Sequence, residues 1–137
     1  MQVQAYLFFD GRCEEALQYY GKHLDAKVEM LMRYKESPQP PMGHEVSGDK
    51  VMHAAFRIGD TQVLASDGFA SGRPKFEGIS LSLSARDDAQ AKRIFGALAD
   101  GGKVTQPLTK TFFASSFGMV TDKFGVPWMI IAGTQAK

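Results

Sequence analysis

The sequence predicts an α+β fold built from two consecutive βαβββ modules. First, a strand, a helix and three strands follow one another twice along the 137 residues. Second, the two helices are offset by about 75 residues, which aligns Ala16 with Ala91. Third, each module ends in a hairpin of two apolar strands. We therefore expect one domain over residues 1–137, with module 1 over about 1–67 and module 2 over about 77–134.

The first module opens with a strand and a helix. Residues 3–9 are an apolar and aromatic run bounded by Asp10-Gly11, which indicates a buried strand with the helix cap at that dipeptide. Residues 13–23 then show the three- and four-residue spacing of a helix, carried by Ala16, Leu17, Tyr20 and Leu24. Residues 27–35 alternate around apolar side chains and predict a half-exposed strand.

A long loop precedes the first hairpin. Residues 36–49 contain three prolines and two glycines, which predicts a long loop with polyproline character and no regular element. Loops of this length in a compact domain tend to be functional or mobile, and the sequence does not say whether this one is a lid or exchanges between subunits. Residues 52–58 and 61–66 form the hairpin around Gly59-Asp60. A second loop, residues 67–77, separates the modules.

The second module repeats this order. Residues 78–84 alternate between aliphatic residues and serine, and predict a strand with one buried face. Residues 87–99 form the second helix, with an apolar stripe of Ala91, Ile94, Phe95 and Leu98. A short strand over residues 103–105 follows, and we expect Pro107 to interrupt it.

The final hairpin spans residues 117–132. Its turn is Asp122-Lys123-Phe124-Gly125, where Gly125 is suited to a positive φ angle. Pro127 then begins the last strand and predicts an edge or strand-opening position.

Composition narrows the classes of partner. The formal net charge is +1, from 16 basic and 15 acidic residues, and gives no electrostatic reason to expect nucleic acid or an anionic membrane. Cys13 is the single cysteine, so no disulfide can form within the chain. The sequence shows no signal peptide and no run of about 18–20 apolar residues, so we expect a cytoplasmic protein.

Four stretches carry a family resemblance: residues 5–11, 13–20, 66–67 and, most specifically, 117–128. With the repeated module they resemble the PhnB-like branch of the vicinal oxygen chelate superfamily, which includes glyoxalase I, bleomycin-resistance proteins and extradiol dioxygenases. The resemblance implies curved mixed sheets around a cup, helices on the outside and a homodimer. Members of this branch often carry the label 3-demethylubiquinone 3-methyltransferase, yet this sequence has no Gly-rich strand-to-helix turn followed by an acidic residue.

The resemblance also supplies a test for metal. The metal enzymes of the superfamily hold one divalent ion with four side chains, whose positions fall here near Ala5, Leu64, Gly78 and Met129. None of these four can bind a hard ion. A shift of one residue offers Gln4 and Glu77, but it reverses the faces of the strands. We therefore expect no metal and no cofactor.

The same register predicts which residues line the cup. We expect Leu7 and Phe9 to face inward, while Ile79, Leu81 and Leu83 pack under the helix. His53 is the candidate for general acid–base chemistry, and its alternative is a strand histidine that satisfies a backbone carbonyl. The expected ligand-binding residues are Arg57, Gln62, Ser66, Ser80, Ser82, Phe113 and Met129.

Other residues keep two interpretations. His44 and Glu45 suit either a lid contact or a solvated loop, and Asp67 suits either substrate binding or a turn. Trp128 suits either ligand stacking or packing in the core, and we favour packing. We interpret Cys13 as a structural residue.

Two functions follow from these residues. The first is a metal-free small-molecule-binding protein of the bleomycin-resistance kind, with an unknown ligand. The alternative is an isomerase, lyase or transferase that uses His53 as acid or base, or a metal placed elsewhere.

Overall fold

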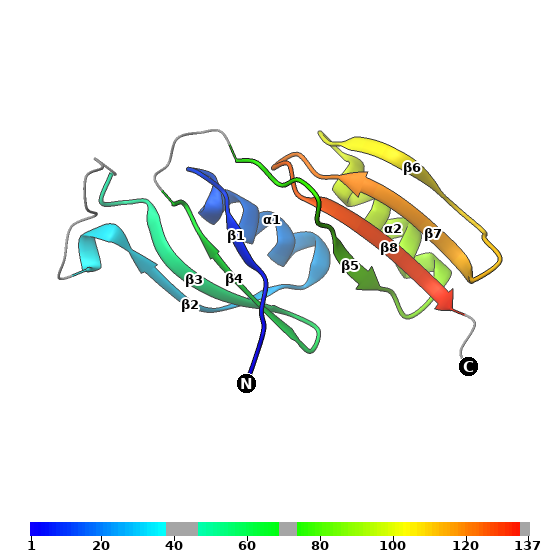
Figure 1. Cartoon of the computed structure of the whole chain (residues 1–137), viewed down its shortest axis with the longest axis horizontal. Helices are drawn as coiled ribbons and strands as arrows, with labels where there is room; N and C mark the ends of the chain where they lie inside the picture. The colour runs from blue at the N-terminus through cyan, green and yellow to red at the C-terminus, as the bar shows by residue number, and fades with distance from the viewer. Residues whose placement is uncertain (38–46, 69–73, 135–137) are drawn as a thin grey trace. The chain divides into compact units, whose positions relative to one another are not determined.

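The computed structural model describes residues 1–37, 47–68 and 74–134. The chain divides into two compact units, residues 1–75 and 76–137, and each holds a strand, a helix and three further strands in that order (Figure 1). The predicted α+β class and the repeated βαβββ order are therefore confirmed. Within the described residues, neither α-helix is long and apolar enough to cross a membrane.

Unit 1 is a four-stranded mixed sheet with one helix against it. Its elements are β1 (Tyr6–Phe8), α1 (Cys13–Leu24), β2 (Lys27–Arg33), the 3-10 turn η1 (Tyr34–Glu36), β3 (Val51–Ile58) and β4 (Thr61–Ser66). The strand order is β1-β4-β3-β2, in which β1 runs parallel to β4 and the other neighbours are antiparallel. Both β1 and β2 are shorter than predicted. Strand β2 ends at Arg33 and is followed directly by η1.

Aromatic packing under α1 makes the core of unit 1. The ring of Tyr20 lies 6.1 Å from that of Phe56 and 6.3 Å from that of Phe9, measured between centroids. Leu7 and Phe9 are both buried against the helix, so the prediction that they face the cup is wrong. Because both faces of β1 carry large apolar side chains, alternation alone does not say which face meets the helix.

Unit 2 repeats the arrangement. Its elements are β5 (Leu81–Ser84), α2 (Asp88–Ala99), β6 (Lys103–Thr109), β7 (Ala114–Thr121) and β8 (Pro127–Thr134). The strand order is β5-β8-β7-β6, with β5 parallel to β8. In Figure 1 each helix lies against one face of its own sheet.

The second helix forms as the sequence predicts. The carboxylate of Asp87 caps it by accepting the backbone N–H of Gln90 at 2.8 Å, and the predicted apolar stripe is buried. Gly101 has a φ of +75° and ends the helix in the left-handed region.

Two strand predictions in unit 2 need correction. β6 does not stop before Pro107 but runs through it to Thr109. It is an edge strand with register shifts on both sides of Gln106, so the missing N–H of proline removes no regular ladder bond. β5 starts only at Leu81, and Ile79 is 57% exposed rather than packed under the helix.

The final hairpin is confirmed. Gly125 has a φ of +91°, and the Asp122 carboxylate accepts the backbone N–H groups of Phe124 and Val126. Its other oxygen accepts the indole N–H of Trp128 at 2.9 Å, and Trp128 is buried, so core packing is its role. Pro127 opens β8, which lies between β5 and β7 and is not an edge strand.

Candidate functional site

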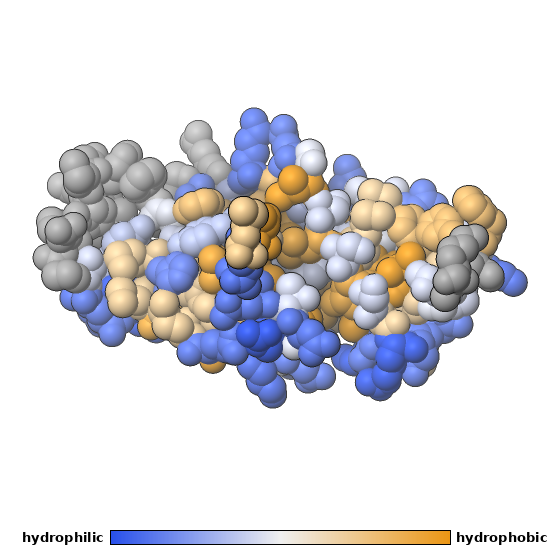
Figure 2. Space-filling model, turned by 60° about the horizontal axis from the view of Figure 1, so that its bottom comes forward, coloured by the Kyte–Doolittle hydropathy of each residue, from blue (hydrophilic) through white to orange (hydrophobic). Residues whose placement is uncertain are grey.

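Helix α1 lies against one face of the first sheet. Strand alternation and the pairing register place a mixed set of side chains on the opposite face, which we name the first open face: Tyr6, Phe8, Met30, His53, Ala55, Arg57, Gln62, Leu64 and Ser66. Figure 2 shows apolar residues at the surface of each unit among hydrophilic side chains. Such a mixture of apolar wall and hydrogen-bonding groups is typical of small-molecule sites.

One half of the first open face is aromatic. Tyr6 stacks on Phe8 with 4.9 Å between ring centroids and 27° between ring planes. The hydroxyl of Tyr6 lies 2.7 Å from Nδ1 of His53. Phe8 is 53% exposed and Tyr6 is 37% exposed, so both rings present area to solvent. A flat ligand can stack on this pair and reach the imidazole with a polar group.

The phenol of Tyr6 is protonated near neutrality. Burial raises the pKa of Tyr6, and its hydrogen bond with Ser66 offsets this only in part. The phenol therefore stays protonated, and its hydroxyl shares a hydrogen bond with Nδ1 of His53. Nε2 of His53 takes no part in this hydrogen bond.

The other half of the first open face is a chain of polar contacts. Gln4 donates from Nε2 to Oε1 of Gln62 at 2.7 Å, and Gln62 donates to Glu29 at 2.9 Å. Arg57 completes the chain through an ion pair of 3.1 Å with Glu29. The hydrogen bonds from Gln62 and then Arg57 lower the pKa of Glu29. The predicted residues Arg57 and Gln62 thus lie on the same face as His53, and Glu29 connects the two of them to each other.

Ser66 and Asp67 are largely occupied by the backbone. Ser66 lies on the first open face but is buried, and its hydroxyl accepts the N–H of Gly68 at 2.8 Å. Asp67 is 1% exposed and accepts three backbone N–H groups, from Gly11, Cys13 and Val51. Its carboxylate is buried and bonded to the backbone, so Asp67 has a structural role and is not available to a substrate. The helix cap expected at Asp10 or Gly11 comes instead from this distant acid.

Cys13 is structural, as predicted. The thiol is fully buried at the start of α1. Burial raises its pKa far above the ordinary value, and the charges of Asp67 and Glu14 add to the effect. A protonated, buried thiol is not a nucleophile. His44 and Glu45 lie outside the described residues, as does most of the predicted 36–49 loop.

Unit 2 has a corresponding second open face, opposite α2. Ser82 pairs in register with Met129, which pairs with Met119, so these three side chains share a row. Phe113 packs edge-on against Phe117 of the same face, with 5.1 Å between ring centroids. Ser80 precedes β5 and is exposed. Whether these residues bind a ligand remains a prediction.

The residues do not fit the divalent ion of the superfamily's metal enzymes. Within the part of the chain that the structure describes, no group of three or more His, Cys, Asp or Glu side chains could hold a metal. Of the expected ligand positions, Leu64 and Met129 lie on open faces and carry no hard donor. Gln4 reaches the first open face, but its amide is bonded to that of Gln62.

Sequence reasoning missed Tyr6 and Phe8. The register assigned to β1 placed their neighbours Leu7 and Phe9 in the cup, and a shift of one residue exchanges the two sets. A usable signal was present, because a tyrosine hydroxyl tolerates a half-exposed face better than the centre of an aliphatic core.

Comparison with known proteins identifies relatives over the whole chain. A family model described as 3-demethylubiquinone-9 3-methyltransferase matches residues 1–131. Protein YjdN of Escherichia coli K12 is 36% identical over 138 residues, which cover 95% of this chain and 94% of that protein. The crystal structure of protein PA1353 from Pseudomonas aeruginosa has 40% identity and a TM-score of 0.85, with 98% of this chain and 99% of that chain covered.

More distant structures share the fold alone. The PhnB protein of Bacillus cereus is 23% identical with a TM-score of 0.81, over 97% of this chain and 100% of that chain. The fosfomycin resistance protein FosX of Mesorhizobium loti is 13% identical with a TM-score of 0.60, over 98% of this chain and 92% of that chain.

Proposed function

The chain belongs to the 3-demethylubiquinone-9 3-methyltransferase family, the PhnB-like branch of the glyoxalase and bleomycin-resistance superfamily, and we propose that it binds a small molecule on its first open face. The observation that carries the proposal is the stacked Tyr6–Phe8 pair with His53 hydrogen-bonded beside it. We do not propose methyl transfer, because the sequence lacks the glycine-rich turn of a nucleotide-cofactor site.

The proposed ligand is a planar molecule that bears a hydroxyl or carbonyl oxygen. Its ring would stack on Phe8 and Tyr6, and its oxygen would bond to His53 or to the amide of Gln62. Aromatic stacking supplies affinity without requiring a charged ligand, while the polar half of the face fixes orientation.

Isothermal titration calorimetry with 7-hydroxycoumarin, a planar probe with a hydroxyl, tests this proposal. We expect saturable binding that Phe8→Ala weakens about tenfold, because the stacking surface is lost. Phe112→Ala is the matched control, since Phe112 is 92% exposed in unit 2 and belongs to neither contact. Equal affinity of the two variants would reject the first open face as the site.

A catalytic alternative rests on the Tyr6–His53 hydrogen bond. An imidazole hydrogen-bonded to a phenol can act as general base in an isomerase, lyase or transferase that acts next to a carbonyl. Exchange of the methyl protons of pyruvate in deuterated water, followed by NMR, tests for such chemistry. Exchange that His53→Gln abolishes while 7-hydroxycoumarin still binds would favour the enzyme, and no exchange above the buffer rate would favour the binding protein.

We also propose that two copies associate as a homodimer. Apolar side chains of the first open face are exposed in the single chain, namely Phe8 at 53% and Met30 at 41%. Cover by a second copy would bury them and turn an open face into a cup. Size-exclusion chromatography with light scattering should give twice the 15.0 kDa chain mass. A mass of one chain at micromolar concentration would contradict the dimer.

A further inference from the structure

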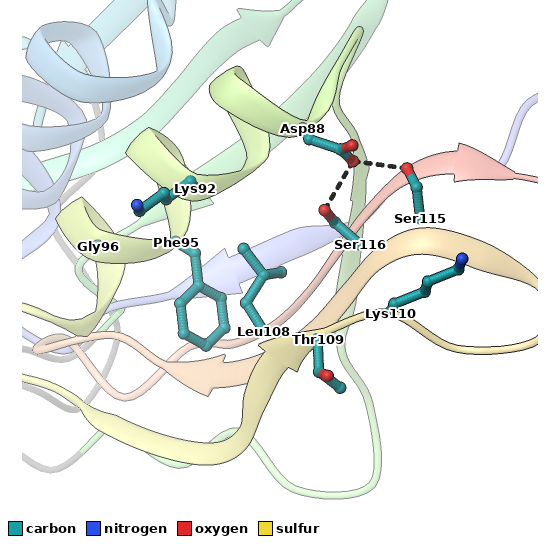
Figure 3. Close-up of a pocket in the computed structure, with 9 residues that line it drawn as sticks. All are labelled: Asp88, Lys92, Phe95, Gly96, Leu108, Thr109, Lys110, Ser115 and Ser116. Atoms are coloured by element: carbon teal, nitrogen blue, oxygen red, sulfur yellow. Dashed lines mark hydrogen bonds between the residues drawn. The ribbon is translucent and has the colours of Figure 1, made fainter.

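A groove in unit 2 lies apart from both open faces. It runs between α2 and the strands β6 and β7, on the helix side of the second sheet, and has a volume of about 560 Å³ (Figure 3). Lys92, Phe95 and Gly96 of α2 form one wall, and Leu108 and Lys110 belong to the other. Small-molecule pockets in proteins span roughly 300–1,000 Å³, so the groove has a suitable size.

The base of the groove is apolar and is kept open by a glycine. Figure 3 shows the Phe95 ring and the Leu108 side chain beside one another between the two walls. A Cβ atom built on Gly96 would meet no other atom within 4 Å. Glycine is unfavourable inside a helix, and packing does not require it at this position. The missing side chain leaves space in the groove that a large side chain such as leucine would fill.

The charged groups around the groove favour an anion. Lys92 and Lys110 extend from the two walls, and among the described residues neither has a hydrogen bond or an ion pair. The only acid in the lining, Asp88, accepts hydroxyl bonds from Ser115 and Ser116, as the dashed lines in Figure 3 show. Two cations and one carboxylate leave a net charge of +1, which complements a monoanion.

We propose that this groove binds an amphipathic monocarboxylate, with its apolar chain over Gly96 against Phe95 and Leu108. The carboxylate would pair with Lys92 or Lys110 at the rim, where the long lysine stems can swing toward it. The site is independent of the proposed function, because none of its residues belongs to the first open face.

Calorimetric titration of the whole protein with sodium decanoate, below its micelle concentration, tests the proposal. We expect one saturable site that Gly96→Leu weakens at least tenfold by filling the groove, whereas Gly96→Ala changes the affinity less than threefold. The double substitution Lys92→Met and Lys110→Met should weaken binding about tenfold, and Lys103→Met, outside the groove, should not. Decanol, which has the same chain without the charge, should bind at least tenfold more weakly than decanoate.

Three results would overturn the proposal: no saturable binding of decanoate, unchanged affinity in the double lysine variant, or equal binding of decanol. Circular dichroism and melting temperature establish that Gly96→Leu folds, and if it does not, the lysine variants decide. Loss of decanoate binding in Phe8→Ala with full binding in Gly96→Leu would assign the anion to the first open face instead and reject the groove.

Discussion

Asp67 and Asp122 perform the same task in the two units. Each is a buried carboxylate that collects N–H donors from a turn and from the strand or helix that follows. Asp67 joins the start of α1 to β3 and to the end of β4, which are far apart in sequence. A buried charge is tolerated because donors surround it, and for the same reason it is not available to a substrate.

Replacing Asp67 should be strongly destabilising. Asp67→Ala leaves the part-buried N–H group of Gly11 and the buried N–H groups of Cys13 and Val51 without their acceptor, at about 1–3 kcal/mol each, so we expect a loss of about 3 kcal/mol or more. Urea unfolding measures it. Asp60→Ala, in the exposed turn of the first hairpin, is the control and should cost little. A loss below about 1 kcal/mol would mean that water replaces the carboxylate.

Cys13 should make stability depend on alkaline pH. Its pKa is raised in the folded state, whereas the unfolded thiol ionises at about 8.5. Above that pH the unfolded chain loses the proton first, so the free energy of unfolding falls, by up to about 1.4 kcal/mol per pH unit. Urea unfolding of the wild type and of Cys13→Ala between neutral and alkaline pH isolates this slope. Parallel pH profiles of the two proteins would contradict it.

At the scale of the element, two glycines at the contact between α2 and its sheet have opposite roles. Gly96 lies on the helix with open space above it. Gly118 of β7 lies under the helix, where a Cβ atom would come within 2.7 Å of the Phe95 ring and 3.0 Å of the Leu108 backbone. The close approach of α2 to its sheet therefore depends on Gly118 and not on Gly96.

These two glycines make a matched pair of substitutions. Gly96→Ala should stabilise the protein by about 0.5–1 kcal/mol, because alanine restricts the unfolded chain and favours the helix. Gly118→Ala should destabilise it by about 1–3 kcal/mol through overpacking. Thermal and urea unfolding of both variants measure the difference. Destabilisation by Gly96→Ala would show that the groove is closed in solution.

At the scale of the whole molecule, the two units have the same strand order and the same parallel pairing of first and last strands. Their open faces differ in chemistry. The first carries Tyr6, His53 and an arginine–glutamate pair, and the second carries serines, methionines and Phe117. The two units therefore share their topology but not the chemistry of their open faces.

The chain should therefore carry no stoichiometric divalent metal. Inductively coupled plasma mass spectrometry of untagged protein, purified without chelator, should find less than one ion in ten chains, and EDTA should leave the melting temperature unchanged. Mn²⁺, Ni²⁺ and Zn²⁺ added after EDTA should not raise it either. One bound ion per chain would return the enzyme interpretation to first place and direct attention to His53 and the residues of the 36–49 loop.

The sequence alone determined the order of elements and most of their bounds. Helical spacing identified α1 and α2, and the turn at Gly125 identified the last hairpin, because these signals are local and depend on neighbouring residues. The same holds for the family, since a long match does not depend on which face of a strand is buried. His53, Arg57 and Gln62 were also grouped correctly, because alternation along β3 and β4 assigns them to one face.

Only the tertiary structure decided which face of β1 meets α1, and hence that Tyr6 and Phe8 belong to the candidate site. It also decided that Asp67 caps a helix 54 positions away, and that a proline can lie inside β6. Each of these depends on residues that are distant in sequence. Tyr20 of α1 packs against the strand face that carries Phe9, and a backbone amide of α1 donates to Asp67. The proline is tolerated because no further strand pairs with β6 in its described sheet. The groove has the same origin, because Gly96 becomes an opening only when Leu108 lies opposite it.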